Sequence, residues 1–373
     1  MYRLGLLIII GVLLTMQVGF TEITKVSVVW HDAKTLTVEG RGYADTDGFY
    51  QRWPARAKAK LNSDVWGGSD RTAGMVVRFV TDSTDISAKW TLSNSELDLP
   101  NLAAIGMSGL DLYVRYEGKW RWLGIGKPLA MENEATLVSE LPAGKREFAL
   151  YLPLYNGLKL LQIGIREGTT IEPAGPRPRN LKPVVFYGSS ITQGASASRP
   201  GMAYASIIGR RLDIPIINLG FSGVGKCEPE VADLLAELDP QIYVIDCMPN
   251  MYASDVNGRL RYLLKILKEH HPNTPVVLVA DPIYQNAYAF PKGTNVEKTD
   301  PVRAMNRNAT LKKIYEDNLP EWNGKLFYVP SPQLFGDDSE ATVDGYHPSD
   351  LGLVRMADTL TPMVERALAV SEK

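Results

Sequence analysis

Residues 184–191 read VVFYGSSI, a short apolar run that ends in a glycine and two serines. A run of this length without polar interruption is typical of a strand buried on both faces of a sheet. Four similar runs follow, each separated by a pattern typical of a helix: IPIINLG (214–220), QIYVIDC (241–247), TPVVLVADP (274–282) and KLFYVP (325–330). This alternation predicts an α/β fold, a doubly wound parallel five-stranded sheet over 184–373.

The region before this sheet has a different pattern. Residues 23–170 contain many short alternating or apolar stretches with few helix signals, which predicts an antiparallel β-sandwich of the jelly-roll type. The stretches are KVSVVWHD, TLTVEG, GMVVRFVTD, TDISAKWTLS, LDLYVRYEGKWRWLG and KREFALYLPLY. Tyr113, Trp120 and Trp122 are expected in the sandwich core rather than on a sugar-binding surface. Residues 171–183 contain four prolines and are predicted to be a linker.

The first residues resemble a secretion signal. Arg3 precedes the apolar run LGLLIIIGVLL, which is too short to cross a membrane comfortably. We therefore expect residues 1–22 to be a signal peptide, the protein to be secreted or periplasmic, and the mature chain to have no integral membrane span.

The composition limits the classes of partner. The 373 residues carry a net charge of −2, which gives no electrostatic basis for binding nucleic acid. The four histidines are dispersed, so no metal site is expected. The two cysteines, Cys227 and Cys247, follow neighbouring predicted strands, and both a disulfide and a pair of buried thiols are compatible with that placement.

Polar residues follow the predicted strands where each strand ends. Because ligands of such sheets bind outside the carboxyl ends of the strands, these residues are expected to meet at one edge. Ser190 follows the first strand, Gly223 the second and Asn250 the third, while Asp344 and His347 precede the last helix. A serine, two possible oxyanion donors and a histidine with a nearby carboxylate are the components of nucleophilic acyl transfer.

The stretch NLGFSGVGKC (218–227) also fits the glycine and lysine spacing of a phosphate-binding loop. However, Cys227 stands where that loop needs a serine or threonine for magnesium. Glu228 and Glu230 place negative charge where the phosphate would lie. No nucleotide is therefore expected, and the glycines are interpreted as a turn that presents an amide to an oxyanion.

These blocks, in this order, resemble the SGNH (GDSL-type) serine hydrolases over about 184–373. The resemblance implies that Ser190 in GSSI is the nucleophile, with Asp344 and His347 in DGYHPSD as acid and base. It implies an oxyanion hole formed by Ser190, Gly223 in NLGFSG and Asn250 in DCMPN. The sequence departs from the family pattern at Ser189, where aspartate is usual, and in DCMPN, which lacks the Gly-x-Asn-Asp form.

The N-terminal region adds a second, shorter resemblance. Gly109-Leu110-Asp111-Leu112-Tyr113 is similar to the GxDLY signature of the β-domain that precedes one secreted branch of these enzymes. Together the resemblances imply a serine esterase that removes short acyl groups, O-acetyl groups on carbohydrate above all, without a cofactor. A small ester or acetylated glycan is then the expected substrate. A thioesterase, a lipid esterase or an acyltransferase would use the same blocks. The alternative that is not an enzyme is a catalytically silent glycan-binding protein.

Overall fold

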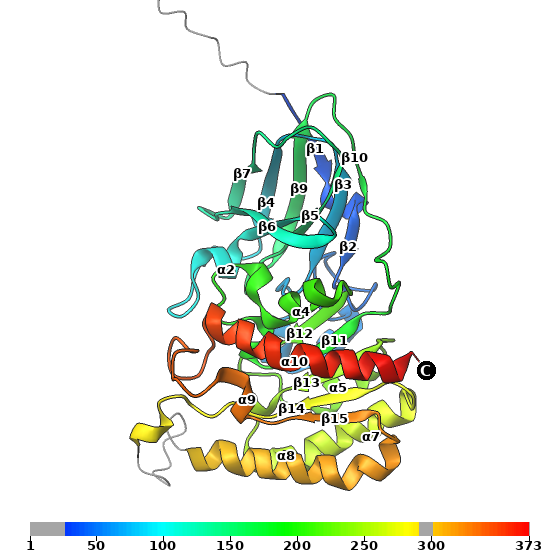
Figure 1. Cartoon of the computed structure of the whole chain (residues 1–373), viewed down its shortest axis with the longest axis vertical. Helices are drawn as coiled ribbons and strands as arrows, with labels where there is room; N and C mark the ends of the chain where they lie inside the picture. The colour runs from blue at the N-terminus through cyan, green and yellow to red at the C-terminus, as the bar shows by residue number, and fades with distance from the viewer. Residues whose placement is uncertain (1–26, 291–300, 373) are drawn as a thin grey trace, which may run out of the picture.

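A computed structural model describes residues 27–290 and 301–372 (Figure 1). The predicted signal peptide, residues 1–22, lies outside the described residues. Within the described part of the chain, no helix has both the length and the apolar character needed to cross a bilayer.

Two antiparallel sheets form the N-terminal region, as predicted. One sheet has the strand order β1-β9-β4-β7, and the other has the order β10-β3-β8-β5-β6, with β2 also paired to β3. The strands are β1 (Val28–Asp32), β2 (Thr37–Glu39), β3 (Val76–Thr81), β4 (Ile86–Leu92), β5 (Leu110–Tyr116), β6 (Lys119–Gly126), β7 (Glu132–Val138), β8 (Arg146–Tyr151), β9 (Leu158–Arg166) and β10 (Ile171–Pro173).

The two antiparallel sheets share one apolar core. Alternate side chains of β4 are buried, and they meet the inward side chains of β3, β5 and β8 from the other sheet. Phe79 and Phe148, on adjacent strands, stack with their ring centres 5.4 Å apart in this core. The strand period of two in the sequence therefore translates directly into the sandwich.

Three features of this region differ from the prediction. Strands β7 and β9 were not among the stretches predicted from the sequence, and β10 pairs with β3 inside the segment predicted as a linker. The predicted core position of Tyr113, Trp120 and Trp122 is wrong. Tyr113 is buried, but in a separate cluster on the other face of its sheet, and Trp122 is 51% exposed.

Residues 40–72 form an irregular segment rather than strands. It contains the short helices η2 (Ala55–Ala59) and α1 (Ser63–Gly67); elsewhere in the N-terminal region are η1 (Ala33–Thr35) and α2 (Ala104–Ser108). Trp53 and Val65 of this segment are buried in the same cluster as Leu219 of the parallel sheet. The segment therefore belongs to the sandwich by sequence position but packs against the following sheet.

The second half of the chain is the predicted five-stranded parallel sheet, with the order β12-β11-β13-β14-β15. Its strands are β11 (Val184–Gly188), β12 (Ile216–Gly220), β13 (Ile242–Asp246), β14 (Val276–Val279) and β15 (Leu326–Val329). In the parallel register, Gly188 lies beside both Gly220 and Asp246. Three strands thus end at one level, and the loops that follow them meet at one edge of the sheet.

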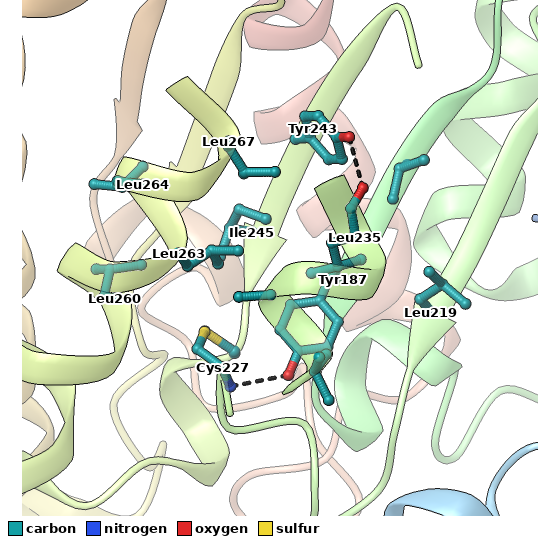
Figure 2. Packing of buried hydrophobic residues seen from close by; sticks show 14 of the residues in the cluster. Tyr187, Leu219, Cys227, Leu235, Tyr243, Ile245, Leu260, Leu263, Leu264 and Leu267 are labelled. Atoms are coloured by element: carbon teal, nitrogen blue, oxygen red, sulfur yellow. Dashed lines mark hydrogen bonds between the residues drawn. The ribbon is translucent and has the colours of Figure 1, made fainter. Parts of the chain in front are cut away.

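Helices cover both faces of this sheet, as the doubly wound prediction requires (Figure 1). One face packs against α5 (Pro229–Ala236), α7 (Arg261–His270) and α8 (Pro301–Trp322), and the other against α4 (Tyr204–Leu212), α9 (Pro332–Phe335) and α10 (Asp350–Ser371). Figure 2 shows the first of these cores, where Tyr187 and Ile245 of the sheet meet leucines of α5 and α7. The remaining short helices are α3 (Ser190–Gln193), η3 (Pro200–Met202), η4 (Met248–Asn250), α6 (Ala253–Asp255), the π-helical turn η5 (Val256–Leu260) and η6 (Ala287–Ala289).

Candidate active site

The predicted nucleophile lies at a sharp turn from strand β11 into helix α3. Ser189 caps the helix, since its hydroxyl accepts a hydrogen bond from the backbone N–H of Ile191. Ser190 is therefore the first helical residue, and its own N–H has no acceptor within the helix. Gly188 permits the turn, because a Cβ atom there would lie 2.3 Å from the carbonyl oxygen of Asp246. A serine thus replaces the usual family aspartate as the helix cap.

Ser190, His347 and Asp344 form one hydrogen-bonded chain. The Oγ atom of Ser190 lies 3.0 Å from Nε2 of His347, and Nδ1 of His347 lies 2.7 Å from Oδ2 of Asp344. The second oxygen of Asp344 accepts the backbone N–H groups of Tyr346 and His347. Partial burial acts to raise the pKa of Asp344, but the hydrogen bonds from His347 outweigh it and the net pKa is lowered. This keeps the carboxylate ionised beside the imidazole.

The turn after β12 provides a free backbone donor. Gly223 has a φ of +75°, which a glycine adopts without strain. The N–H of Ser222 donates to the side-chain oxygen of Gln193, which ties this turn to the nucleophile helix. Within residues 27–290 and 301–372, the N–H of Gly223 has no acceptor. This donor is therefore not used in hydrogen bonding within the described part of the chain.

Asn250 lies against the same turn but uses its amide internally. Its Nδ2 atom is 3.0 Å from the carbonyl oxygen of Phe221 and 3.3 Å from that of Gly225. Both amide hydrogens are thereby directed at the turn, and Asn250 braces it in this state. Lys226 follows the turn, and the Glu228 carboxylate accepts its backbone N–H, so a carboxylate stands where a phosphate loop would hold its ligand.

Several residues that sequence reasoning missed hold the nucleophile from the N-terminal region. The hydroxyl of Tyr155 donates to the carbonyl oxygen of Ser190 at 3.2 Å. The side-chain amide of Gln193 donates to the carbonyl oxygen of Leu154 at 2.9 Å. Both contacts join positions more than 30 residues apart, and no periodicity or motif in the sequence predicts them.

Arg52 is the most deeply placed of these supports. Its guanidinium donates to the carbonyl oxygens of Gly220 at 2.6 Å and of Gly68 at 2.8 Å, and it lies 4.0 Å from the ring centre of Phe221. Trp53 stacks on the same Phe221 ring at 5.0 Å. Burial lowers the pKa of Arg52, which is 1% exposed. A fully buried cation thus fixes the strand end from which the Gly223 turn begins.

Two buried carboxyl groups lie beneath the site. Oδ2 of Asp246 accepts hydrogen bonds from the hydroxyls of Thr192 and Tyr204, each at 2.9 Å, and burial raises its pKa to about 7. Asp281 pairs instead with the guanidinium of Arg307 and accepts the hydroxyl of Tyr346 at 2.7 Å. Burial raises the pKa of Asp281 as well, with Arg307 opposing the shift.

The two cysteines meet beside the site, as their strand positions suggested. Cys227 and Cys247 are buried free thiols whose Sγ atoms lie 2.6 Å apart. Burial raises the pKa of Cys247. The hydroxyl oxygen of Tyr187 accepts the backbone N–H of Cys227 at 2.9 Å (Figure 2). The same hydroxyl donates to the Glu228 carboxylate at 3.5 Å. Among the described residues, no group of three or more His, Cys, Asp or Glu side chains could hold a metal ion.

An open depression of about 600 Å³ borders the loop that carries Asp344 and His347. It is lined by residues 96–103 of the N-terminal region together with Val343, the neighbour of Asp344. Val343 is half exposed, and Asn101 hydrogen-bonds to Ser196, which follows the nucleophile helix. The N-terminal region therefore contributes one wall beside the site.

Comparisons with known proteins agree with this geometry. The sequence pattern of the GDSL-like lipase/acylhydrolase family matches residues 181–365, and that of the GxDLY family, the N-terminus of SGNH-hydrolase-type esterases, matches residues 28–171. No curated protein matches the chain.

Solved structures resemble the whole chain. A protein described as a GDSL-like lipase from Bacteroides ovatus is 32% identical, with a TM-score of 0.84 over 92% of this chain and 98% of its own. A salicylyl-acyltransferase from a tetracycline biosynthetic pathway is 19% identical, with a TM-score of 0.72 over 91% and 97% of the two chains. A family two carbohydrate esterase from Clostridium thermocellum is 16% identical, with a TM-score of 0.55 over 80% and 94%. The last two show a shared fold.

The chain matches both family patterns, and it is 32% identical to a solved structure over nearly the full length of both chains. The chain belongs to the GDSL-like lipase/acylhydrolase family, and it is an SGNH-type ester hydrolase with a GxDLY N-terminal region.

Proposed function

We propose that this protein hydrolyses short-chain acyl esters, O-acetyl esters of carbohydrate above all, through an acyl-enzyme on Ser190. The observation that carries the proposal is the unbroken chain from Ser190 through His347 to Asp344, with distances of 3.0 and 2.7 Å. A hydroxyl, an imidazole and an ionised carboxylate in this order make a nucleophile with its base.

In the first half of the reaction, Nε2 of His347 takes the proton of Ser190 as Oγ attacks the ester carbonyl. Asp344 holds the imidazole through Nδ1 and stabilises the imidazolium that forms. The tetrahedral intermediate collapses when His347 passes its proton to the leaving alcohol. In the second half, water attacks the acyl-enzyme with His347 as base, and the acid product and free Ser190 result.

The oxyanion would be held by the backbone N–H groups of Ser190 and Gly223, both aimed from turns rather than from mobile side chains. Asn250 would join these donors by exchanging one of its two hydrogen bonds. Its longer hydrogen bond, 3.3 Å to Gly225, is the one that would be exchanged for the oxyanion. Its shorter bond, to Phe221, then continues to fix the turn. Such preorganised donors supply much of the rate enhancement in acyl transfer.

Carbohydrate as the acyl carrier is supported by three features. The signal-like residues 1–22 place the protein, in our proposal, outside the cytoplasm, in the periplasm or secreted. The open depression beside Val343 leaves room for a bulky alcohol portion of the ester. The fold is shared with a carbohydrate esterase. It is also shared, with a higher TM-score, with an acyltransferase, so transfer to an acceptor alcohol is the second candidate function.

The test is hydrolysis of p-nitrophenyl acetate and butyrate, followed by acetate release from acetylated xylan. Ser190→Ala should lower kcat at least about a thousandfold, because the nucleophile is removed while binding remains. Ser206→Ala is the matched control, since Ser206 is also buried but its hydroxyl has no hydrogen-bond partner among the described residues. A rate that survives Ser190→Ala contradicts the assignment. Acyl transfer to added alcohol in preference to water would favour the acyltransferase.

A further inference from the structure

A cavity of about 510 Å³ lies between the N-terminal region and helix α4 and shares no residue with the candidate active site. We call it the basic cavity because six of the residues that line it are cationic: Arg115, Lys119, Arg121, Arg199, Arg210 and Arg211. One of its walls is the hairpin of β5 and β6, and the other is α4 with the residues before it. In Figure 1 this hairpin lies directly above α4.

Three of the six cations are neutralised locally. Arg115 pairs with Asp213 at 2.9 Å, Arg199 with Asp111 at 2.8 Å and Arg211 with Asp358 at 2.6 Å. These pairs join the hairpin to α4 and the residues beside it, and α4 to α10, so these three cations serve to hold the elements together.

Among the described residues, the remaining three cations form no salt bridge, although the Asp111 carboxylate interacts electrostatically with Arg210. Lys119 and Arg121 are exposed on β6. Arg210 is half buried, its guanidinium lies 4.1 Å from the ring centre of Tyr113, and its Nη1 atom is buried without an acceptor among the described residues. A buried guanidinium nitrogen with an unused donor favours an incoming anion, because its own hydrogen-bonding capacity is otherwise lost on folding.

Aromatic rings beside these cations are held in fixed orientations. The indole N–H of Trp120 donates to Asp213 at 3.1 Å, and that of Trp122 donates to Asp111 at 3.0 Å. Trp122 lies outside the lining of the cavity and remains 51% exposed, and the guanidinium of Arg199, which lines the cavity, lies 5.4 Å from its ring centre. An anchored, half-exposed indole face offers apolar contact to the C–H face of a sugar ring at low entropic cost.

We propose that the basic cavity is a second binding site, for an anionic sugar residue of a glycan chain. The anion, a uronate carboxylate or a sulfate ester, would bind Arg210 and Lys119, and the sugar ring would lie against Trp122. No bond is made or broken there, so the site works without Ser190. The cavity lies between the N-terminal region and helix α4 of the parallel-sheet region. A charged polysaccharide bound there would stay on the enzyme while the active site acts on another part of the same polysaccharide.

The experiment is calorimetric titration of the full-length Ser190→Ala protein, which prevents turnover. The probes are a hexamer of galacturonate, a sulfated heparin hexasaccharide and neutral xylohexaose. We expect saturable binding of an anionic hexamer and at least tenfold weaker binding of the neutral one. Lys119→Met and Arg210→Met, which keep side-chain length but remove charge, should each raise Kd roughly tenfold or more.

Lys159→Met is the matched control, because Lys159 is an exposed lysine of β9 away from the cavity, and it should change Kd less than about twofold. Equal loss in this variant would show diffuse charge attraction and overturn the proposal, as would equal binding of the neutral hexamer or no binding at all. Preference between galacturonate and the sulfated probe identifies the source of the anion. The cavity substitutions in the Ser190 enzyme should leave kcat on p-nitrophenyl acetate unchanged, so failure of this site is separable from failure of the esterase.

Discussion

The two halves of the candidate active site are held in opposite ways. The nucleophile half, which we define as the turns 188–194 and 220–225, is fixed by residues distant in sequence. Arg52 reaches Gly220 across 168 positions, and Tyr155 reaches Ser190 across 35. The acid–base half, the loop 341–349, is held more locally around its carboxylate: the hydrogen bonds that the Asp344 carboxylate accepts come from within three residues.

The difference shows where the site depends on the rest of the molecule. The acid–base loop is held by its own backbone, by Gln285, which hydrogen-bonds to Ala341, Thr342 and Gly345, and by Tyr346 on Asp281. All of these supports lie in the parallel-sheet region. The nucleophile half needs the N-terminal region, which supplies a buried cation and a tyrosine hydroxyl to its backbone. The GxDLY region is thus part of the hydrolase scaffold, in addition to forming its own sandwich.

Asp344→Asn should produce the largest effect and leave the fold in place, because the acid–base half is local. The amide retains an acceptor for the backbone N–H groups but no longer stabilises the imidazolium, so kcat should fall about 10³–10⁴-fold. Steady-state kinetics with p-nitrophenyl acetate and urea unfolding measure the two quantities. Asp338→Asn, an exposed carboxylate in the segment leading to this loop, should keep full kcat. A large loss of stability in Asp344→Asn would contradict the view that the Asp344 carboxylate is held locally and contributes little to the fold.

Arg52→Met should instead lower both stability and turnover. It removes hydrogen bonds to Gly220 and Gly68 and leaves their carbonyl oxygens buried without that donor, so the free energy of unfolding should decrease by about 3 kcal/mol. Turnover should fall because the Gly223 turn loses its support. Arg56→Met, at an exposed arginine of the same segment, should change little. If the folded Arg52→Met protein kept full kcat, Arg52 would not be needed to hold the nucleophile half in its active arrangement.

Asp246 offers a pH test of the same half. Its pKa is about 7 in the folded protein against about 3.9 in an unfolded chain, so the folded state binds the proton more tightly. The stabilisation is therefore complete below about pH 4 and is lost as the pH rises through about 7, a decrease on the order of 2 kcal/mol between pH 5 and pH 8. Urea unfolding across this range measures it. Asp246→Asn should flatten the curve, and an equal slope in that variant would assign the dependence to another group.

Tyr155→Phe should have the smallest effect. It deletes one hydroxyl that donates to the carbonyl oxygen of Ser190, which is worth about 1 kcal/mol of unfolding free energy. We expect kcat to fall less than tenfold with KM unchanged, because the ring still packs and only the orientation of the turn relaxes. Kinetics at saturating ester measure this. An increase in KM alone would place Tyr155 in substrate binding instead.

The same contrast explains what could be predicted from sequence. The parallel strands were predictable because each is an apolar run between helical patterns, and their polar ends converge by a general rule of such sheets. Ser190, Asp344 and His347 were therefore predicted together, and the structure brings them into hydrogen-bonding distance. Their catalytic roles remain predictions.

The supports of the nucleophile half were not predictable. Arg52 lies in a segment without periodicity, and an arginine in such a segment is ordinarily exposed. The inward use of the Asn250 amide depends on the path of the Gly223 turn, which no residue type specifies. Strand β7 was missed for a related reason: it is a half-exposed edge strand with alternating glutamates, and its apolar signal is weak.

The irregular segment 40–72 has a consequence for how the protein is made. It covers β12, an edge strand of the parallel sheet, yet the chain reaches Gly220 only 168 residues after Arg52. During synthesis the sandwich strands can pair as they emerge, while this segment must wait without its partner surface. Arg52 is buried only when β12 arrives and its edge is closed against strand pairing with other chains. The support of the nucleophile by Arg52 can therefore form only after residue 220 has been synthesised, although the residues of segment 40–72 are made much earlier.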